Sequence, residues 1–412
     1  RDGQYLGGGT GSNTGTGTRM CIVGGYSGPV LDTIDYITIS TLGDAEDFGD
    51  LAAGTYSGGA IGNSTRGLKL GGYSPGVSNA VHVFNFASKG DAVDSVNLST
   101  VTAYPGECSN EVRGLVAGNS HPGATNQIQS IEFALTNDAI DFGDLSYNAL
   151  APAGCASSTR GIFCGGQTPS PNVNNIEFVT IMTKGDTTDF GDMTIPRFGE
   201  TGVNDTVRGI FAGGASTTPH VPSHTASSDV IDYVTISQTG NAVDFGNLIL
   251  AQFPGASMNN TTRGIIARQN SPAGPTAIMD TIITRTLGNA TDFGDCVSAT
   301  GSNVAGGVCN ATRGILAGGY STGFINIIQF VTMATLGDAT DFGDLLTAAN
   351  NNRGASSKTR GLILGGSTPS NSNVIESVQI ATTGNSVDFG DMAYVGGNTG
   401  QVTCNSNAHG GI

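Results

Sequence analysis

The sequence has no tryptophan, only five histidines and little positive charge. Its 412 residues include 17 Lys+Arg against 33 Asp+Glu, and charged residues make up only 12% of the chain. The net charge of −16 repels polyphosphate and no basic cluster interrupts it, so we expect no nucleic-acid binding. No run approaches the roughly 18 apolar residues that a spanning helix needs, so we also expect no membrane insertion.

Cysteine and histidine are too sparse to indicate a disulfide framework, a zinc site or a common catalytic centre. The seven cysteines include no C-x-x-C pair, and no G-x-S-x-G motif or His/Cys/Asp cluster is present. His220 and His224 lie four residues apart, in a long segment rich in proline and serine where that spacing imposes no common face. We expect no cofactor and no enzyme. A pair of carboxylates for glycoside hydrolysis stays open, because sequence does not show their separation.

What the sequence does contain is an internal repeat that covers the chain. The tripeptide T-R-G or a close variant recurs at intervals of 47, 47, 47, 48, 55, 50 and 47 residues. A single core rarely grows beyond about 250–300 residues, and a repeat array accounts for the extra length. The chain is therefore expected to be one domain over 1–412. The repeats are marked by Arg19, Arg66, Arg113, Arg160, Arg208, Arg263, Arg313 and Arg360.

Each repeat reads as four short strands, here named a to d. Strand a is made of small residues before the arginine, and strand b is an apolar run ended by glycines, as in RGIFCGG. Strand c is β-branched and aromatic, as in IDYVTI, and strand d is the DFGDL element, entered through a Gly-Asp or Gly-Asn turn. Four strands in about 47 residues are typical of a propeller blade, so the predicted fold is an all-β, eight-bladed β-propeller with four-stranded antiparallel blades.

The order of these strands resembles the kelch repeat family, with a phenylalanine such as Phe48 where kelch repeats carry tryptophan. Two repeats also lack the paired glycines, at Ala117-Gly118 and Ala267-Arg268. The particular repeat motif, STRGIF followed by IDYVTI and ATDFGDL, resembles repeats of virion structural proteins from marine tailed phages, especially those of cyanobacteria. This resemblance implies a kelch-like propeller in a tail fibre, tail tip or surface appendage, and a virion or extracellular location.

The C-terminal tail predicts how the ring closes. Within 393–412, Cys404 lies five residues before His409, as Cys108 lies five residues before Arg113, so the tail reads as one more strand a. We expect it to supply the inner strand of the first blade. The rival geometry is an open stack of repeats in which the tail stays unpaired.

The repeated arginine is predicted to pair with the first aspartate of the d element. Both begin their strands at the same end of the blade, where a bidentate charge-assisted pair could form. An alternative is a ring of calcium sites, but some flanking acids become asparagine, as at Asn241 and Asn289, and the spacing differs from that of known calcium loops. The aspartates are Asp47, Asp94, Asp141, Asp189, Asp244, Asp292, Asp341 and Asp388.

The remaining acids are expected to form a solvated acidic exterior that keeps the protein soluble, or alternatively to steer a cationic partner. They include residues of strand c, namely Asp35, Glu132, Glu177, Asp232, Asp280 and Glu376.

Sequence variation is concentrated in the b–c and d–a connections, which project from one face. A scaffold that is constant on one face and diversified on the other is typical of loop-borne recognition. Aromatic residues beside Asn, Ser and Thr also suit sugar stacking, although each ring could equally pack on a neighbouring blade. The candidate binding residues are Tyr56, Tyr104, Tyr147, Phe198, Phe253, Tyr394, His220 and His224.

The sequence thus favours a non-enzymatic recognition propeller of a phage virion. Its expected partners are other virion proteins and a glycan or protein of the host surface. The alternatives are a kelch-type scaffold for protein interaction and, less favoured, a glycan hydrolase.

Overall fold

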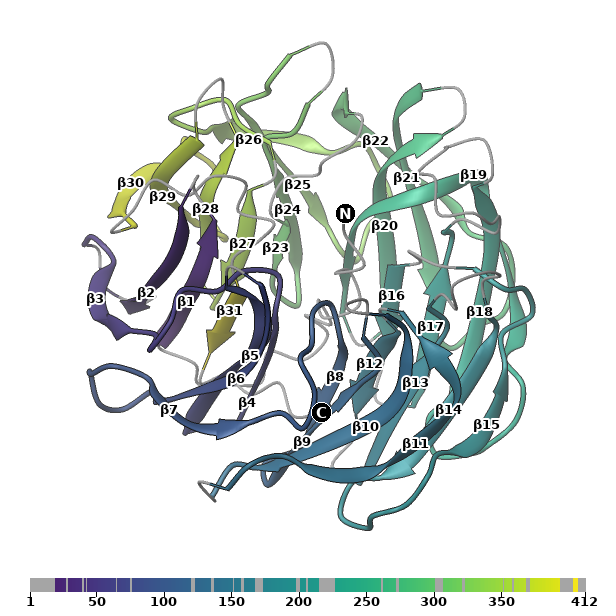
Figure 1. The fold of residues 1–412 in the computed structure, drawn as a ribbon. Coiled ribbons are helices and arrows are strands. Elements are labelled where there is room, and N and C mark those ends of the chain that lie inside the picture. Colours follow the sequence, from purple (N-terminus) through teal and green to yellow (C-terminus); the bar gives the residue numbers. More distant parts are fainter. Residues whose placement is uncertain are drawn as a thin grey trace.

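The protein is an all-β, eight-bladed β-propeller with no helix in the described chain (Figure 1). The computed structural model describes residues 19–392 and 403–406, except for 27–28, 39–40, 42, 64, 75, 120–122, 135–136, 151, 157–158, 167–172, 198–200, 205–206, 215–226, 261, 272–273, 301–306, 321–322, 351, 358 and 368–370. Each blade is an antiparallel sheet of four strands, which run from a to d in the predicted order.

The first four blades contain the following strands, in the order a to d. They are β31 (Thr403–Ser406), β1 (Arg19–Tyr26), β2 (Val30–Thr38) and β3 (Glu46–Asp50); β4 (Gly59–Gly62), β5 (Arg66–Ser74), β6 (Gly76–Asn85) and β7 (Val93–Asn97); β8 (Gly106–Ser109), β9 (Arg113–Ala117), β10 (Thr125–Glu132) and β11 (Ile140–Ala149); and β12 (Ala153–Ala156), β13 (Arg160–Cys164), β14 (Asn175–Thr180) and β15 (Thr188–Asp192).

The last four blades follow the same order, but the fifth and sixth share one long strand, β19, which pairs first with β18 and then with β20. They are β16 (Thr201–Asn204), β17 (Arg208–Ala212), β18 (Ser228–Thr235) and β19 (Val243–Asn259); β19 again, β20 (Arg263–Ser271), β21 (Gly274–Ile283) and β22 (Thr291–Thr300); β23 (Gly307–Cys309), β24 (Arg313–Ala317), β25 (Ile327–Thr332) and β26 (Thr340–Asp344); and β27 (Arg353–Ser356), β28 (Arg360–Ser367), β29 (Asn371–Gln379) and β30 (Val387–Asp391).

The predicted closure of the ring is confirmed. Strand β31 pairs antiparallel with β1, with Cys404 opposite Ile22, and so becomes strand a of the first blade. In Figure 1 the yellow β31 lies beside the purple β1. The open stack is wrong, because it required an unpaired tail. Of the predicted closing segment 393–412, the structure describes only 403–406.

The hydrophobic core is divided among the contacts between neighbouring blades. The described buried residues form eight clusters, and each combines strands of two adjacent blades. The cluster that joins the last blade to the first contains Leu362, Ile375 and Phe389 on one side and Ile22 and Ile37 on the other. Both faces of every blade therefore bury apolar surface, which explains how short sheets without helices fold stably.

A belt of hydrogen bonds joins each strand d to the next blade. The Gly-Asp or Gly-Asn turn places a side-chain Oδ1 where it accepts from the main-chain amide at the last polar position of the preceding DFGD element. Asp44 accepts from Asp391 at 3.3 Å and so continues the belt across the closure. Only an acceptor is needed, which explains why Asp and Asn replace each other. The eight acceptors are Asp44, Asp91, Asp138, Asp186, Asn241, Asn289, Asp338 and Asn385.

The predicted Arg–Asp ion pair is not formed by Arg66, Arg113 or Arg313. Their described contacts include no ion pair to a strand-d aspartate. Strand c lies between strands b and d, which separates their backbones by about 10 Å. The guanidinium reaches the next blade instead. Five arginines each donate to a carbonyl just beyond strand c of the following blade, as Arg113 does to Ile181 at 2.9 Å; the others are Arg66, Arg160, Arg208 and Arg313.

The arginines also cover aromatic rings of their own blades. The guanidinium of Arg208 lies 4.5 Å from the ring centre of Tyr233, and that of Arg313 lies 4.5 Å from that of Phe330. Arg113 also forms an ion pair with Glu132 at 2.7 Å. The arginine is thus repeated because its guanidinium binds a carbonyl of the next blade while it lies over a ring of its own blade.

The strand-d aspartates are all exposed, and two of them show a local role. Asp292 and Asp341 each accept from the amide two residues ahead, at 2.9 and 3.0 Å, and so shape the turn of the backbone after the phenylalanine. In the part of the chain that the structure describes, no group of three or more His, Cys, Asp or Glu could hold a metal ion.

The expectation of a solvated acidic exterior is wrong for most of the strand-c acids. Asp35, Glu177, Asp232, Asp280 and Glu376 are buried, each exposed by 5% or less. Four of them accept a bond from the main-chain amide of the residue that follows the DFGDL element of the preceding blade, as Glu376 does from Leu346 at 2.9 Å; the other three are Glu177, Asp232 and Asp280. Glu132 is the exception, because it is half-buried against Arg113.

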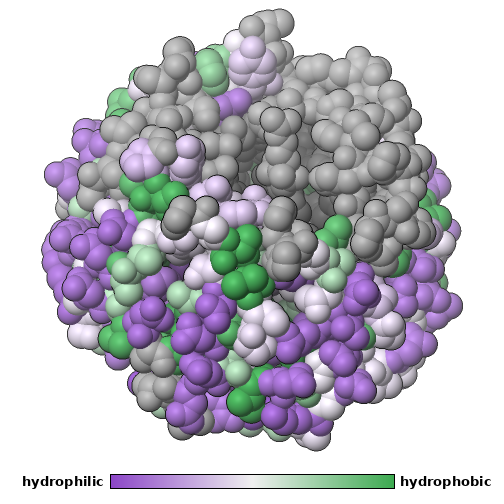
Figure 2. Space-filling model, in the orientation of Figure 1, coloured by the Kyte–Doolittle hydropathy of each residue, from purple (hydrophilic) through white to green (hydrophobic). Residues whose placement is uncertain are grey.

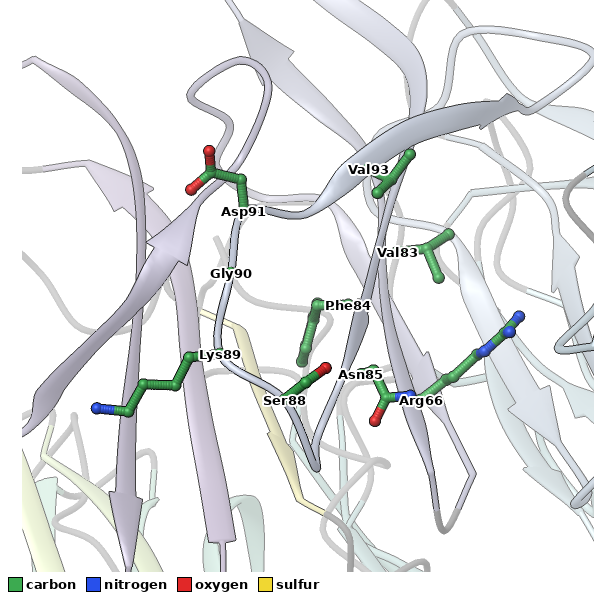
Figure 3. Close-up of a pocket in the computed structure, with 9 residues that line it drawn as sticks. All are labelled: Arg66, Val83, Phe84, Asn85, Ser88, Lys89, Gly90, Asp91 and Val93. Atoms are coloured by element: carbon green, nitrogen blue, oxygen red, sulfur yellow. The ribbon is translucent and has the colours of Figure 1, made fainter.

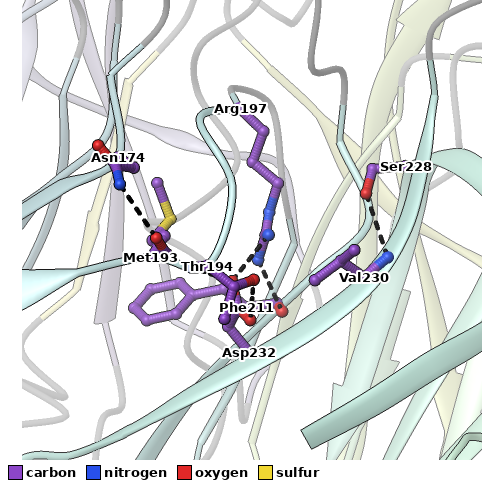
Figure 4. Close-up of polar contacts among 8 residues, drawn as sticks. All are labelled: Asn174, Met193, Thr194, Arg197, Phe211, Ser228, Val230 and Asp232. Atoms are coloured by element: carbon purple, nitrogen blue, oxygen red, sulfur yellow. Dashed lines mark hydrogen bonds and ion pairs between the residues drawn. The ribbon is translucent and has the colours of Figure 1, made fainter. Parts of the chain in front are cut away.

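The most elaborate of these inter-blade contacts lies between the fourth and fifth blades (Figure 4). Asp232 accepts from Thr194 and also forms an ion pair with Arg197 at 2.8 Å, both partners being fully buried. Arg197 also donates to the carbonyl of Phe211 at 3.2 Å. This arginine comes from a d–a connection, where a charged side chain is expected at the surface, and yet it is fully buried.

Candidate functional site

The connections lie at the two ends of the propeller as their strand directions predicted. Because strands run a to d in antiparallel order, the b–c and d–a connections lie at one end of each blade, here called the loop face. The a–b and c–d connections lie at the other end. The described surface in Figure 2 is mostly hydrophilic at the periphery, with hydrophobic residues in small scattered patches.

Three of the predicted binding residues have described side chains on the loop face, namely Tyr56, Tyr104 and Tyr147. Phe253 begins the part of β19 that pairs with β20, opposite Asn270, and only its backbone is described. The remaining candidates lie outside the described residues; they are Phe198, Tyr394, His220 and His224.

Tyr56 and Tyr104 belong to a row of four rings, here called the tyrosine ladder. Its order is Tyr26, Tyr56, Tyr73 and Tyr104. Ring centres are 5.3 Å apart from Tyr26 to Tyr56, 5.3 Å from Tyr56 to Tyr73, and 6.4 Å from Tyr73 to Tyr104. The middle pair is stacked, with 23° between the planes. The ladder runs from the first blade across the second to the entrance of the third.

Sequence reasoning missed Tyr26 and Tyr73, because its aromatic candidates came from the d–a connections, whereas these two residues lie where strand b meets the b–c connection. Both stand seven residues after the repeated arginine, directly after paired glycines. Tyr26 is 40% exposed, and the other three rings are half-buried. The repeat alignment could have found them, since Tyr320 occupies the same position in the seventh repeat.

The backbone beneath the ladder is held by hydrogen bonds to both neighbouring blades. Tyr56 and Tyr73 form an isolated β-bridge, with Tyr73 donating to Tyr56 at 2.9 Å. One residue earlier, Thr55 accepts from Gly25 at 2.9 Å and its hydroxyl donates to Gly71 at 2.7 Å. The backbone that carries the rings is therefore fixed by hydrogen bonds, which reduces the conformational entropy lost when a ligand binds.

Backbone strain is also concentrated here. Ser57 and Tyr104 have φ of 54° and 53°, and they are the two non-glycine residues with positive φ in the described chain. Such a conformation costs of order 1–3 kcal/mol and persists where the surroundings enforce it, often at a binding site. One lies next to Tyr56 in the chain and the other carries a ladder ring.

Tyr147 has a structural role instead. Its hydroxyl donates to the carbonyl of Gly165 at 2.8 Å, and its ring packs against a core cluster between the third and fourth blades. The packing alternative that the sequence left open therefore describes this residue.

A buried polar group lies behind the ladder at the contact of the second and third blades. Lys69 of β5 is fully buried at a position where other repeats carry apolar residues such as Val116 and Phe163. Its Nζ has no hydrogen-bond partner and faces Gly58, while the carboxylate of Glu107 from β8 faces Gly59. Opposite Lys69 on strand c, His82 is 1% exposed.

Burial sets the protonation of this group. It lowers the pKa of Lys69 to about 7, an effect that the charge of Glu107 partly offsets. It raises the pKa of Glu107 to about 7, against the attraction of Lys69 and an amide bond from Ala60. Burial also lowers the pKa of His82, which Asp94 partly offsets. Near neutral pH both groups therefore exchange between their charged and neutral forms.

A shallow pocket of about 280 Å³ lies at the opposite end of the second blade, along the hairpin between β6 and β7 (Figure 3). Arg66 and Lys89 stand on opposite sides of this hairpin. Both cations make contacts between blades, since Arg66 donates to Phe133 of the third blade and Lys89 pairs with Glu46 of the first. Both cations of this pocket are therefore already engaged in contacts between blades, so the pocket is a poor site for an anionic ligand.

Comparison with known proteins gives no further assignment: no family model matches the chain, and no curated protein matches it significantly. The structure therefore establishes the propeller, which is compatible with a binding scaffold, and leaves the function to the site. Among the residues with described positions there is no helix able to cross a membrane.

Proposed function

We propose that this chain is a non-enzymatic recognition propeller of a virion structural protein, which binds a glycan or protein of a host surface through its loop face. The observation that carries the proposal is the tyrosine ladder, a row of partly exposed rings on the face where the repeats vary. The opposite end is uniform, because its arginines and Gly-Asp turns join the blades. A rigid ring with one diversified face is a suitable platform for recognition.

The virion assignment is supported by the resemblance of the repeat motif to repeats of virion structural proteins of tailed phages. It implies an extracellular location, with other virion or appendage proteins as the neighbours of the ring. Labelling of intact particles with an antibody to residues 1–412 tests this location. Detection only inside the host cell would contradict it.

Binding is tested with the purified chain on an array of host-surface polysaccharides and on whole host cells. Saturable binding to the array or the cells supports the proposal, and a lack of both contradicts it. A parallel assay for released reducing sugar distinguishes binding from hydrolysis; release that is lost on substitution of a loop-face acid would favour a glycan hydrolase.

The second candidate is a kelch-type scaffold for protein interaction, which the propeller fold favours on its own. Capture of one defined protein partner by the immobilised chain, in the absence of polysaccharide binding, would support that function.

A further inference from the structure

We propose that the tyrosine ladder is a binding site for a neutral polysaccharide, whose sugar rings pack along the exposed surface of Tyr26, Tyr56, Tyr73 and Tyr104. This inference rests on the recognition function proposed above and assigns it a place and a ligand class. The first argument is shape. Four rings follow one another at 5.3 to 6.4 Å across three blades, which matches an elongated ligand better than a compact one.

The second argument is charge. The four chain segments that carry the ladder contain no charged residue, although the protein has a net charge of −16. They are residues 20–31, 51–59, 70–81 and 98–106. An acidic polymer would be repelled by the protein as a whole, and a basic one would be drawn to its exposed acids elsewhere. An uncharged polar chain suits this neutral strip best.

The third argument is the pairing of apolar faces with hydroxyl groups. The ring of Tyr73 lies 5.3 Å from that of Tyr56 and 6.4 Å from that of Tyr104, so these three phenol groups are neighbours. Sugars bind such surfaces with their apolar C–H faces on the rings and their hydroxyls on adjacent polar groups. The positive φ of Tyr104, and of Ser57 next to Tyr56, shows that the backbone carrying these rings is held in an unfavourable conformation.

The test uses the full chain in affinity gel electrophoresis against soluble neutral glucan, mannan and galactan, with polygalacturonate as the acidic comparison. We expect retardation by at least one neutral polymer and none by polygalacturonate. The double variant Tyr56→Ala/Tyr73→Ala should weaken binding by about tenfold or more, as expected for loss of aromatic anchors. Tyr73→Phe, which keeps the ring, should lose much less.

Tyr320→Ala is the matched control, because Tyr320 occupies the repeat position of Tyr73 but makes an edge-to-face contact with Phe324 in the seventh blade. It should leave binding unchanged, and far-UV circular dichroism verifies that each variant is folded. Binding that persists in the double variant overturns the site but leaves the recognition function intact. Binding only to polygalacturonate, or only to a polyproline peptide titrated in parallel, overturns the ligand class. No binding to any polymer, peptide or host cell overturns both the site and the proposed function.

Discussion

At the scale of single residues, repetition marks structural roles and deviation marks the unusual positions. The Gly-Asp turn recurs because its side-chain oxygen accepts an amide from the neighbouring blade, as Asp186 does from Asp144 at 3.1 Å. Lys69 departs from the pattern by placing an amine where other repeats bury an apolar chain. Such a departure has an energetic consequence that depends on pH.

Replacing Lys69 with methionine should stabilise the protein most near pH 7, and the gain should shrink as pH rises towards 9.5. The unfolded chain keeps Lys69 protonated up to its ordinary pKa of 10.5, whereas the folded protein releases the proton near 7. Between these values the unfolded state binds more protons, so the free energy of unfolding of the wild type rises with pH. Urea titrations of both proteins at several pH values measure the difference.

The same substitution at exposed Lys89 is the control, and its effect should not vary over this pH range. Above pH 7 the depressed pKa of His82 leaves it neutral, so it adds no slope. A gain for Lys69→Met that stays constant or grows with pH would contradict the assignment. Glu107 acts in a different window: its raised pKa favours the folded state below about pH 4.5 and costs stability as pH rises to about 7.

At the scale of elements, the join between blades explains the glycine of the DFGD motif. The phenylalanine forms a bulge in the pairing of strands c and d, as Phe142 does between Asp141 and Gly143. The glycine that follows then touches the turn of the next blade. The second repeat has Val96 at this position, and the turn it faces has Asn137 in place of glycine. Both partners therefore changed together at that join.

Gly143→Ala should lower the free energy of unfolding by about 2–4 kcal/mol. Its φ is 152°, and an added Cβ would lie 2.3 Å from the carbonyl carbon of Gly185 in the next blade. The atoms it would meet belong to the backbone of Gly185 and Asp186, so they cannot move aside without opening the contact between blades. Chemical denaturation followed by circular dichroism measures the loss.

Gly76→Ala is the matched control, because Gly76 also lies in a strand but has no atom within 4 Å of the added carbon and no positive φ. It should change stability by about 0.5–1 kcal/mol at most. Equal losses for the two variants would show that the contact between blades is not the cause.

At the scale of the whole molecule, stability depends on closing the ring, because each blade buries both faces against its neighbours. Deletion of residues 403–412 should lower the melting temperature and expose the first blade to proteolysis. It removes strand β31, so that one edge of β1 loses its hydrogen-bonded neighbour, including the pairing of Ile22 with Cys404. Thermal unfolding and limited proteolysis measure both effects.

A permuted chain provides the control. Residues 401–408 fused directly before Arg19 place Cys404 five residues before that arginine, as Cys108 stands before Arg113. This chain keeps strand a but supplies it from the N-terminal side. Most of the stability should return, whereas a deletion that leaves the melting temperature unchanged would contradict the closure.

The sequence predicted the strand order and the closure well, and the side-chain partners poorly. Alternation along strand c shows that Asp232 shares a face with other polar positions, but not what covers that face. In a propeller the cover is the next blade, so the acids of strand c are buried where a solvated exterior was expected. The Arg–Asp pair is absent at Arg66, Arg113 and Arg313 for a similar reason: strands b and d begin at the same end but are separated by strand c.

The sequence by itself determined the number of blades, their strands and the end at which variation gathers, because these follow from local patterns that recur every 47 or so residues. Only the tertiary structure decided which rings and charges meet. Tyr26 and Tyr56 lie 30 residues apart in the chain, and their contact arises where a strand end of one blade meets the connection to the next. Contacts between blades depend on curvature and spacing in three dimensions, which no pattern within one repeat records.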